Sequence, residues 1–112
     1  MRPTYHLVPV EVWAATDDAE PYAAASLPTE GFIHCTDGVE PLGITFDRYY
    51  AADARPFLAL TVDLDALVVP WRYDVPGSPY PHIYGSVARS AIVAVERIRR
   101  GPDGRFAGVD AA

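Results

Sequence analysis

The stretch Phe57-Leu58-Ala59-Leu60-Thr61-Val62-Asp63 is the clearest strand in this chain and decides its fold. Every position before the final aspartate is apolar or β-branched, a composition that favours extended backbone. Side chains on a strand alternate between two faces, so a run that is apolar on both faces indicates burial. We therefore expect residues 57–63 to lie inside a sheet.

Outward from this strand, the pattern predicts further strands and a few helices. The other expected strands are residues 4–8, 31–35, 68–73 and 91–98, with 80–84 extended or irregular. A short helix is expected to begin at Pro9, a connector with one helical turn at 22–29, and a loop at 74–79. A longer helix is expected from an N-cap at Asp37 to about Ala52, because Leu42, Phe46 and Tyr49 or Tyr50 recur on one face. The elements lack regular βαβ spacing, which predicts an α+β fold with a small, mostly antiparallel sheet and short helices.

The chain has 112 residues, which is the length of one domain with a real hydrophobic core. We expect a single domain over residues 1–112, with its core at about 4–99. The segment 100–112 opens with Gly101-Pro102-Asp103-Gly104, a composition typical of turns. We interpret it as a loose C-terminal tail that follows an arginine-rich edge.

Charge and composition indicate which partners and cellular locations are expected. The net charge is −6 and all nine basic side chains are arginines, a balance that makes nucleic acid an unfavoured partner. Cys35 is the sole cysteine, so no internal disulfide can form. No apolar stretch approaches the ~18 residues of a membrane span, and the N-terminus lacks a signal-like apolar core. We expect a cytoplasmic protein that does not enter a membrane.

The three histidines of the chain stand in three similar apolar or aromatic phrases. These phrases are Tyr5-His6-Leu7-Val8, Gly31-Phe32-Ile33-His34-Cys35-Thr36 and Tyr80-Pro81-His82-Ile83-Tyr84-Gly85. Imidazole titrates near neutrality and can stack, donate, accept or bind metal. The similarity of the phrases suggests that they converge on one pocket, although each ring could also be a separately satisfied core histidine.

Strand alternation separates the side chains of the second phrase. In residues 32–36, Phe32, His34 and Thr36 should point one way, and Ile33 and Cys35 the other. Cys35 is therefore interpreted as a small core residue rather than as a nucleophile that uses His34 as its base.

These phrases are compatible with several chemistries to different degrees. The histidine spacings match no short zinc motif, so we predict no metal, although distant ligands can converge in some folds. Paired carboxylates among Glu30, Glu40, Asp47 and Asp63 would be a weak signal for a hydrolase, because acids at turns also serve solubility. A pocket for a small ligand fits better. Tyr80, His82 and Tyr84 would share one face of an extended segment, and His34 with Thr36 would offer another.

The same phrases carry a resemblance. Tyr-His-Leu-Val-Pro at the start, Glu-Gly-Phe-Ile-His-Cys-Thr in the middle and Pro-His-Ile-Tyr-Gly before the last apolar strand resemble the mostly bacterial domain of unknown function 952, over about residues 4–99. That family is similar to the ADP-ribosyltransferase superfamily. The resemblance implies an ADP-ribosyltransferase-like fold, in which a small split sheet wraps around NAD, and NAD as a co-substrate.

The resemblance also implies roles for particular residues. His6 would be the first motif and bind the ribose and nicotinamide region. His34 with Thr36 would be the second, similar to the His-x-Ser element of the RNA 2′-phosphotransferase branch. The segment with His82 and Tyr84 lies near the third motif, but the glutamate often found there is absent, since Ser90-Ala91-Ile92 stands in its place and Glu96 lies further along.

From these observations we expect an NAD-dependent ADP-ribosyltransferase-like domain that binds NAD or a related nucleotide. His34 and His82 are the expected catalytic residues, and His6, Thr36, Tyr80 and Tyr84 the expected ligand-binding residues. The missing glutamate keeps open a non-catalytic module that binds a small molecule or a partner on the same fold. The sequence leaves the acceptor, the pathway and the oligomeric state open.

Overall fold

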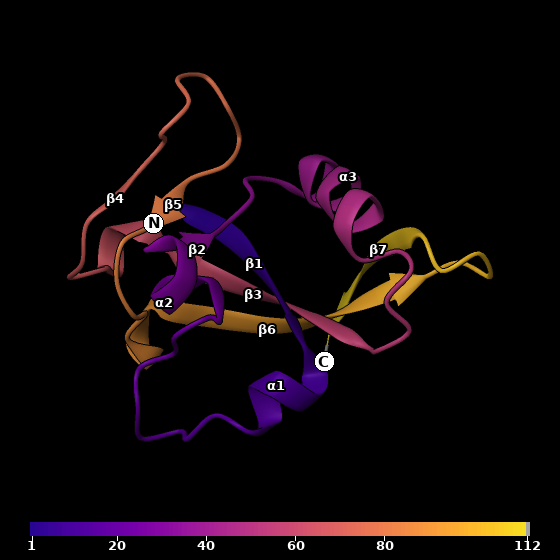
Figure 1. Ribbon diagram of the computed structural model, residues 1–112, viewed down its shortest axis with the longest axis horizontal. Coiled ribbons are helices and arrows are strands. Elements are labelled where there is room, and N and C mark those ends of the chain that lie inside the picture. The colour runs from indigo at the N-terminus through magenta and orange to yellow at the C-terminus, as the bar shows by residue number, and fades with distance from the viewer. Residues whose placement is uncertain (112) are drawn as a thin grey trace.

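Two antiparallel sheets organise the computed structural model, which describes residues 1–111 (Figure 1). The larger sheet has four strands in the order β1-β3-β6-β7, and the smaller has three in the order β2-β5-β4. The strands of the larger sheet are β1 (Pro3–Pro9), β3 (Phe57–Asp63), β6 (Ile92–Arg100) and β7 (Phe106–Ala111). Those of the smaller sheet are β2 (Ile33–His34), β4 (Trp71–Arg72) and β5 (His82–Ile83). The predicted α+β class with mostly antiparallel strands is confirmed.

Strand β3 has the buried position that its sequence predicts. It lies between β1 and β6 and pairs with both of them antiparallel. Leu58, Leu60 and Val62 belong to one core cluster, whereas Phe57 and Ala59 belong to a second. The two clusters use alternate side chains of the strand, which explains why the run is apolar on both faces.

Short helices cover the two faces of the larger sheet. The α-helices are α1 (Val10–Ala14), α2 (Ser26–Glu30) and α3 (Val39–Tyr49), and the 3₁₀ helices are η1 (Leu64–Ala66) and η2 (Arg89–Ala91). Leu42 and Phe46 of α3 are fully buried in the second cluster, while Trp13 of α1 packs against the first. Figure 1 accordingly shows α3 and α1 on opposite sides of the sheet.

The expectation of a loose C-terminal tail is wrong. Residues 106–111 form β7, which pairs antiparallel with β6 as the far edge of the larger sheet. Phe106 and Val109 of β7 pack on the second core cluster. The Gly101–Gly104 segment is the turn of this hairpin, with Gly104 at a φ of +82°. Its composition therefore marks a chain reversal between two strands, not the end of ordered structure.

Several predicted element boundaries also differ. Helix α3 begins after Gly38 rather than Asp37, because the Asp37 carboxylate accepts a hydrogen bond from the Tyr73 hydroxyl and does not cap the helix. Helix α1 begins one residue after Pro9. The strand expected at 68–73 is reduced to Trp71–Arg72, because only these residues pair with β5.

The two sheets meet at a single backbone bridge. Tyr5 of β1 and Thr36, just after β2, exchange two backbone hydrogen bonds of 2.8 Å. Beyond this bridge, no strand among the described residues 1–111 pairs with the outer edge of β1 over its second half. No helix in residues 1–111 is both long and apolar enough to cross a lipid bilayer.

Candidate functional site

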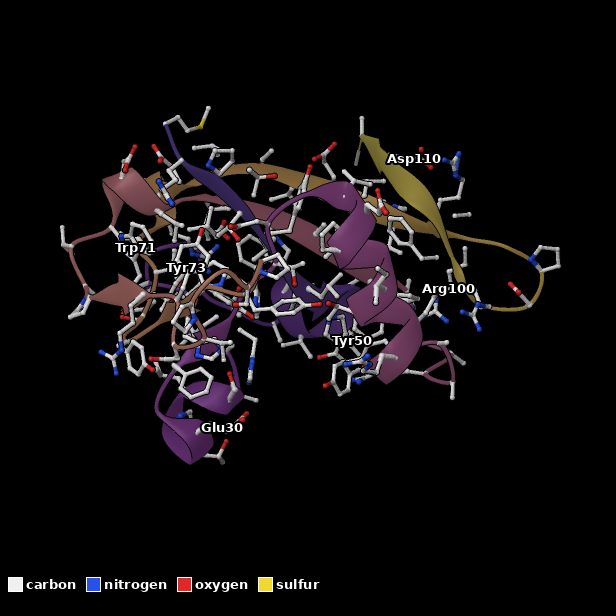
Figure 2. The ribbon with its side chains drawn as sticks, turned by 90° about the horizontal axis from the view of Figure 1, so that it is seen from above. Glu30, Tyr50, Trp71, Tyr73, Arg100 and Asp110 are labelled. Carbon is white, nitrogen blue, oxygen red and sulfur yellow. The ribbon has the colours of Figure 1, made fainter. Side chains whose placement is uncertain are left out.

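A cleft runs along the free edge of β1, between the two sheets and α3. Its larger chamber has a volume of about 660 Å³ and its smaller chamber about 380 Å³. Both chambers are lined by His34, Thr36, Thr45 and Tyr49, so the two meet at these residues. Figure 2 labels Glu30 on α2 and Tyr50 just after α3, which line the larger chamber from different elements.

The free edge of β1 presents unpaired backbone groups to the larger chamber. Both backbone groups of Tyr5 point away from β3, since they bond to Thr36. Backbone groups on a strand alternate in direction, so the N–H and C=O of Leu7 point the same way. Leu7 lines the larger chamber, and beyond the bridge no strand among residues 1–111 pairs with this edge. These two groups can hydrogen-bond a ligand.

His6 holds β1 to β2 at the base of the larger chamber. Its Nδ1–H donates to the His34 carbonyl oxygen at 2.7 Å, and its Nε2 accepts from the Tyr22 hydroxyl at 2.7 Å. The ring is buried, and burial lowers the pKa of His6 from 6.5 to about 4. His6 is therefore neutral near pH 7. A ligand could hydrogen-bond its ring only by displacing the Tyr22 hydroxyl.

His34 and His82 are brought side by side on the smaller sheet. They are register partners of β2 and β5, and their ring centroids lie 5.4 Å apart, edge to face. Phe32 stacks on His82 with ring centroids 4.0 Å apart. His34 Nε2–H donates to Glu30 Oε2 at 3.1 Å, and both side chains are about half exposed. His34 thus lies at the junction of the chambers, and His82 lies beside it in the smaller chamber, so one ligand could contact both rings.

Asp74 connects three side chains of the smaller sheet and its flanking residues, namely Arg72, His82 and Tyr84. Its carboxylate accepts hydrogen bonds from His82 Nδ1–H at 2.6 Å, from Arg72 Nε–H at 2.7 Å and from the Tyr84 hydroxyl. Arg72 also lies over the Tyr84 ring, 4.0 Å from its centroid. The bonds from Tyr84, Arg72 and His82 hold the pKa of the Asp74 carboxyl well below its usual range. Asp74 is therefore ionised at neutral pH.

Of the other predicted site residues, Thr36 and Tyr80 line the cleft and Tyr84 does not. Thr36 is buried and lines both chambers, and Tyr80 lines the smaller one. Tyr84 lines neither chamber. Tyr84 does share a face with His82, as predicted, since both side chains contact Phe32 and both donate to Asp74 Oδ2, but Tyr84 lies outside the chamber that His82 lines.

Sequence reasoning missed Tyr22 and Asp74 and gave little weight to Glu30. Tyr22 reaches His6 from a connector, through a backbone bridge to Val87 that no local pattern announces. Asp74 lies in a loop whose composition indicates only a turn. Glu30 did carry a signal, since it lies four residues before His34 with a tight turn at Gly31 between them.

The second histidine phrase alternates as predicted. Ile33 and Cys35 are buried in the first core cluster, and Phe32 and His34 contact each other on the opposite face. Burial raises the pKa of the Cys35 thiol, which leaves it protonated and unreactive. Within residues 1–111, no three histidine, cysteine or acidic side chains are grouped closely enough to hold a metal ion.

Fold and cleft together define a small α+β protein with a histidine-lined, ligand-sized cleft. A family model described as "Protein of unknown function (DUF952)" matches residues 7–95, and the chain belongs to this family. The comparison with curated proteins found no match.

Two solved structures have a similar fold. Both are of protein CC0527 from Caulobacter crescentus, one of them a double mutant. Each is 20% identical to this chain, with 94% of this chain and 93% of the other covered. The TM-scores are 0.75 for CC0527 and 0.74 for the double mutant, which shows a shared fold.

Proposed function

We propose that the cleft binds NAD or a related nucleotide and that the protein transfers ADP-ribose from it to an acceptor, as its resemblance to ADP-ribosyltransferases implies. The observation that carries this proposal is the free edge of β1 at Leu7. An N–H and a C=O presented side by side complement a primary carboxamide, which donates one hydrogen bond and accepts another. Nicotinamide carries such a carboxamide.

The larger chamber suits the rest of such a ligand. Its volume of about 660 Å³ is within the range of ~300–1,000 Å³ typical of small-molecule sites. Tyr49 and Tyr50 supply aromatic surface for a base, and Ser26 and Thr45 supply hydroxyls for ribose. Arg55 is the one cation in its lining and would meet the pyrophosphate, although it also pairs with Glu11 and Asp53.

The residues around the junction would then share the chemistry. His34 would stack on the nicotinamide ring. Glu30, beside it, would accept a hydrogen bond from a ribose hydroxyl and stabilise the positive charge that develops on the ribose as the glycosidic C–N bond breaks. In this proposal Glu30 replaces the carboxylate that is absent at residues 90–92.

An NMR titration tests binding. We expect nicotinamide and NAD to shift the amide resonance of Leu7 and the ring resonances of His34. Nicotinic acid, whose carboxylate cannot donate a hydrogen bond, should shift the Leu7 amide less. If millimolar NAD leaves Leu7 and His34 unchanged, the proposal is wrong.

Glu30→Gln tests turnover. The variant should release nicotinamide from NAD about 100-fold more slowly, in keeping with loss of one transition-state electrostatic contact, while it still binds NAD. Glu40→Gln is the matched control, because Glu40 is exposed on α3 and lines neither chamber. Equal rates for the two variants would contradict the assigned role of Glu30.

The competing function is a non-catalytic binding module. It is favoured by one observation, namely that no residue of β6 lines either chamber, so neither receives a carboxylate from the last apolar strand. This module would bind NAD or another small molecule without releasing nicotinamide, alone or with cell lysate as a source of acceptors.

A further inference from the structure

We propose that the smaller chamber is the acceptor subsite and binds a small planar hydroxyl compound with an acidic group, whose hydroxyl proton is taken by His82 as Asp74 positions it. This inference rests on the proposed transfer of ADP-ribose. Neither the chamber nor Asp74 is needed to bind NAD in the larger chamber, so the two proposals can fail separately.

His82 is fixed as a proton acceptor. Its Nδ1–H donates to Asp74 at 2.6 Å, so the neutral ring carries its lone pair on Nε2. Stacking on Phe32 at 4.0 Å fixes the ring plane. Nε2 has no hydrogen-bond partner among residues 1–111, and His82 lines the smaller chamber. The free nitrogen is thus available for a hydroxyl bound there.

Asp74 acts through His82 and not on a ligand. It lines neither chamber, and it is held in place by Arg72 and Tyr84. A carboxylate fixed in this way selects the imidazole tautomer and stabilises the imidazolium that forms when His82 accepts a proton. Asp74 is therefore a positioning residue.

The smaller chamber indicates the chemistry of its ligand. At about 380 Å³ it is suited to a small molecule. Ile44, Val75 and Tyr80 give it apolar and aromatic walls that favour a flat ring. Arg48 also lines it, and this guanidinium forms no ion pair within the described part of the chain. An acidic substituent on the ring would complement Arg48.

Because the two chambers meet, an acceptor in the smaller chamber could reach the ribose of an NAD molecule bound in the larger one. The acceptor hydroxyl would give its proton to His82 Nε2 while its oxygen forms a bond to the anomeric carbon of the ribose. The bond from that carbon to the nicotinamide nitrogen breaks, and neutral nicotinamide leaves with the electron pair. The proton then passes from His82 to solvent.

Binding is tested without NAD, with 4-hydroxybenzoate as the probe. We expect it to shift amide resonances of Ile44, Arg48 and Val75, and Arg48→Gln and Ile44→Glu each to weaken binding by about tenfold or more. The matched controls are Arg97→Gln and Val93→Glu, at exposed positions of β6 outside both chambers, which should change the affinity less than about twofold. Absence of shifts at millimolar probe, or equal loss in variants and controls, would overturn the subsite.

Positioning is tested by the ¹⁵N chemical shifts of His82, which report the tautomer. In the neutral ring of the wild type, Nδ1 should show the protonated shift. In Asp74→Ala the two tautomers should mix, whereas Asp110→Ala, an exposed aspartate of β7, should leave the wild-type shifts unchanged. Unchanged His82 shifts in Asp74→Ala would overturn the role of Asp74.

Turnover separates this inference from the proposed function. With NAD alone, His82→Gln should still bind NAD, and with 4-hydroxybenzoate added it should lose the increase in nicotinamide release that the wild type gains. If the wild type binds NAD but 4-hydroxybenzoate and related hydroxy acids never increase release, the acceptor assignment is wrong while the nucleotide proposal stands. If NAD does not bind, the proposed function fails first.

Discussion

At the scale of single residues, His6 shows how a polar side chain can join two sheets. It is buried, both ring nitrogens are satisfied, and it connects β1 with the backbone of β2. An imidazole in this setting is costly to protonate, because burial leaves the positive charge poorly solvated. Protonation of His6 should therefore lower the free energy of unfolding.

The first prediction concerns the pH dependence of stability. His6 has a pKa of about 4 in the folded protein and 6.5 as the ordinary value. Between these values the unfolded chain binds a proton that the folded chain does not, so acid favours unfolding. As the pH falls from 6.5 to 4, His6 should remove about 3 kcal/mol from the free energy of unfolding, and its contribution to the slope should vanish only above about pH 7.5.

Urea denaturation across this range measures the slope. His6→Gln should flatten it, and Val93→Ala, at an exposed position without a titratable group, should keep it. If His6→Gln does not fold, NMR titration of the wild type serves instead, because the His6 ring should not titrate above about pH 5. Titration of that ring near pH 6.5 would contradict the prediction.

The sequence predicted part of the site at this scale. Alternation correctly sorted Phe32 and His34 from Ile33 and Cys35, because that rule depends only on local backbone. It could not reveal Tyr22 or Asp74. Their partners lie in other phrases of the chain, and the bonds to His6 and His82 exist only after the connector and the loop have folded back.

At the scale of elements, the contact between α3 and β7 depends on Gly43. A Cβ at this position would lie 2.6 Å from the Phe106 ring, closer than such atoms can approach. The helix thus has a residue of poor helix propensity at this position, because no side chain larger than hydrogen fits between α3 and the Phe106 ring. Close packing decides this residue against local preference.

The second prediction is that Gly43→Ala destabilises the protein by about 1–3 kcal/mol, although alanine favours helix by about 1 kcal/mol. Thermal unfolding measures the loss. In the background of Phe106→Ala, which removes the ring, the same change should become neutral or stabilising. A destabilisation of equal size in both backgrounds would show that the Phe106 contact is not its cause.

Long elements were easier to predict than short ones. β3 buries most of its side chains, and β6 extends over nine residues, so each offers enough positions for its pattern to be recognised. β2, β4 and β5 have two residues each and are defined by pairing with one another rather than by propensity. A two-residue strand has too few positions for a period to be read.

At the scale of the whole molecule, β7 completes the larger sheet and part of its second core. The interpretation of residues 100–112 as a tail failed because Phe106-Ala107-Gly108-Val109 is a weak strand by composition. Its order comes from pairing with β6 and packing beneath α3. Long-range contacts of this kind are not visible in a single sequence.

The third prediction is that removal of residues 104–112 lowers the melting temperature by at least about 10 °C, since Phe106 and Val109 leave the core and β6 becomes an edge. Circular dichroism measures the transition. Removal of residue 112 alone keeps every pair of β7 with β6 and should have little effect. An unchanged melting temperature in the longer truncation would restore the interpretation of a loose tail.

The loop at 74–79 gives the family a simple route to diversity. It supplies Val75 and Ser78 to the lining of the smaller chamber and Asp74 as the partner of His82, yet none of its residues belongs to either core cluster. Homologues could lengthen, shorten or recompose it with little penalty to folding. Relatives that keep the same scaffold should therefore differ most in what they select at this end of the cleft.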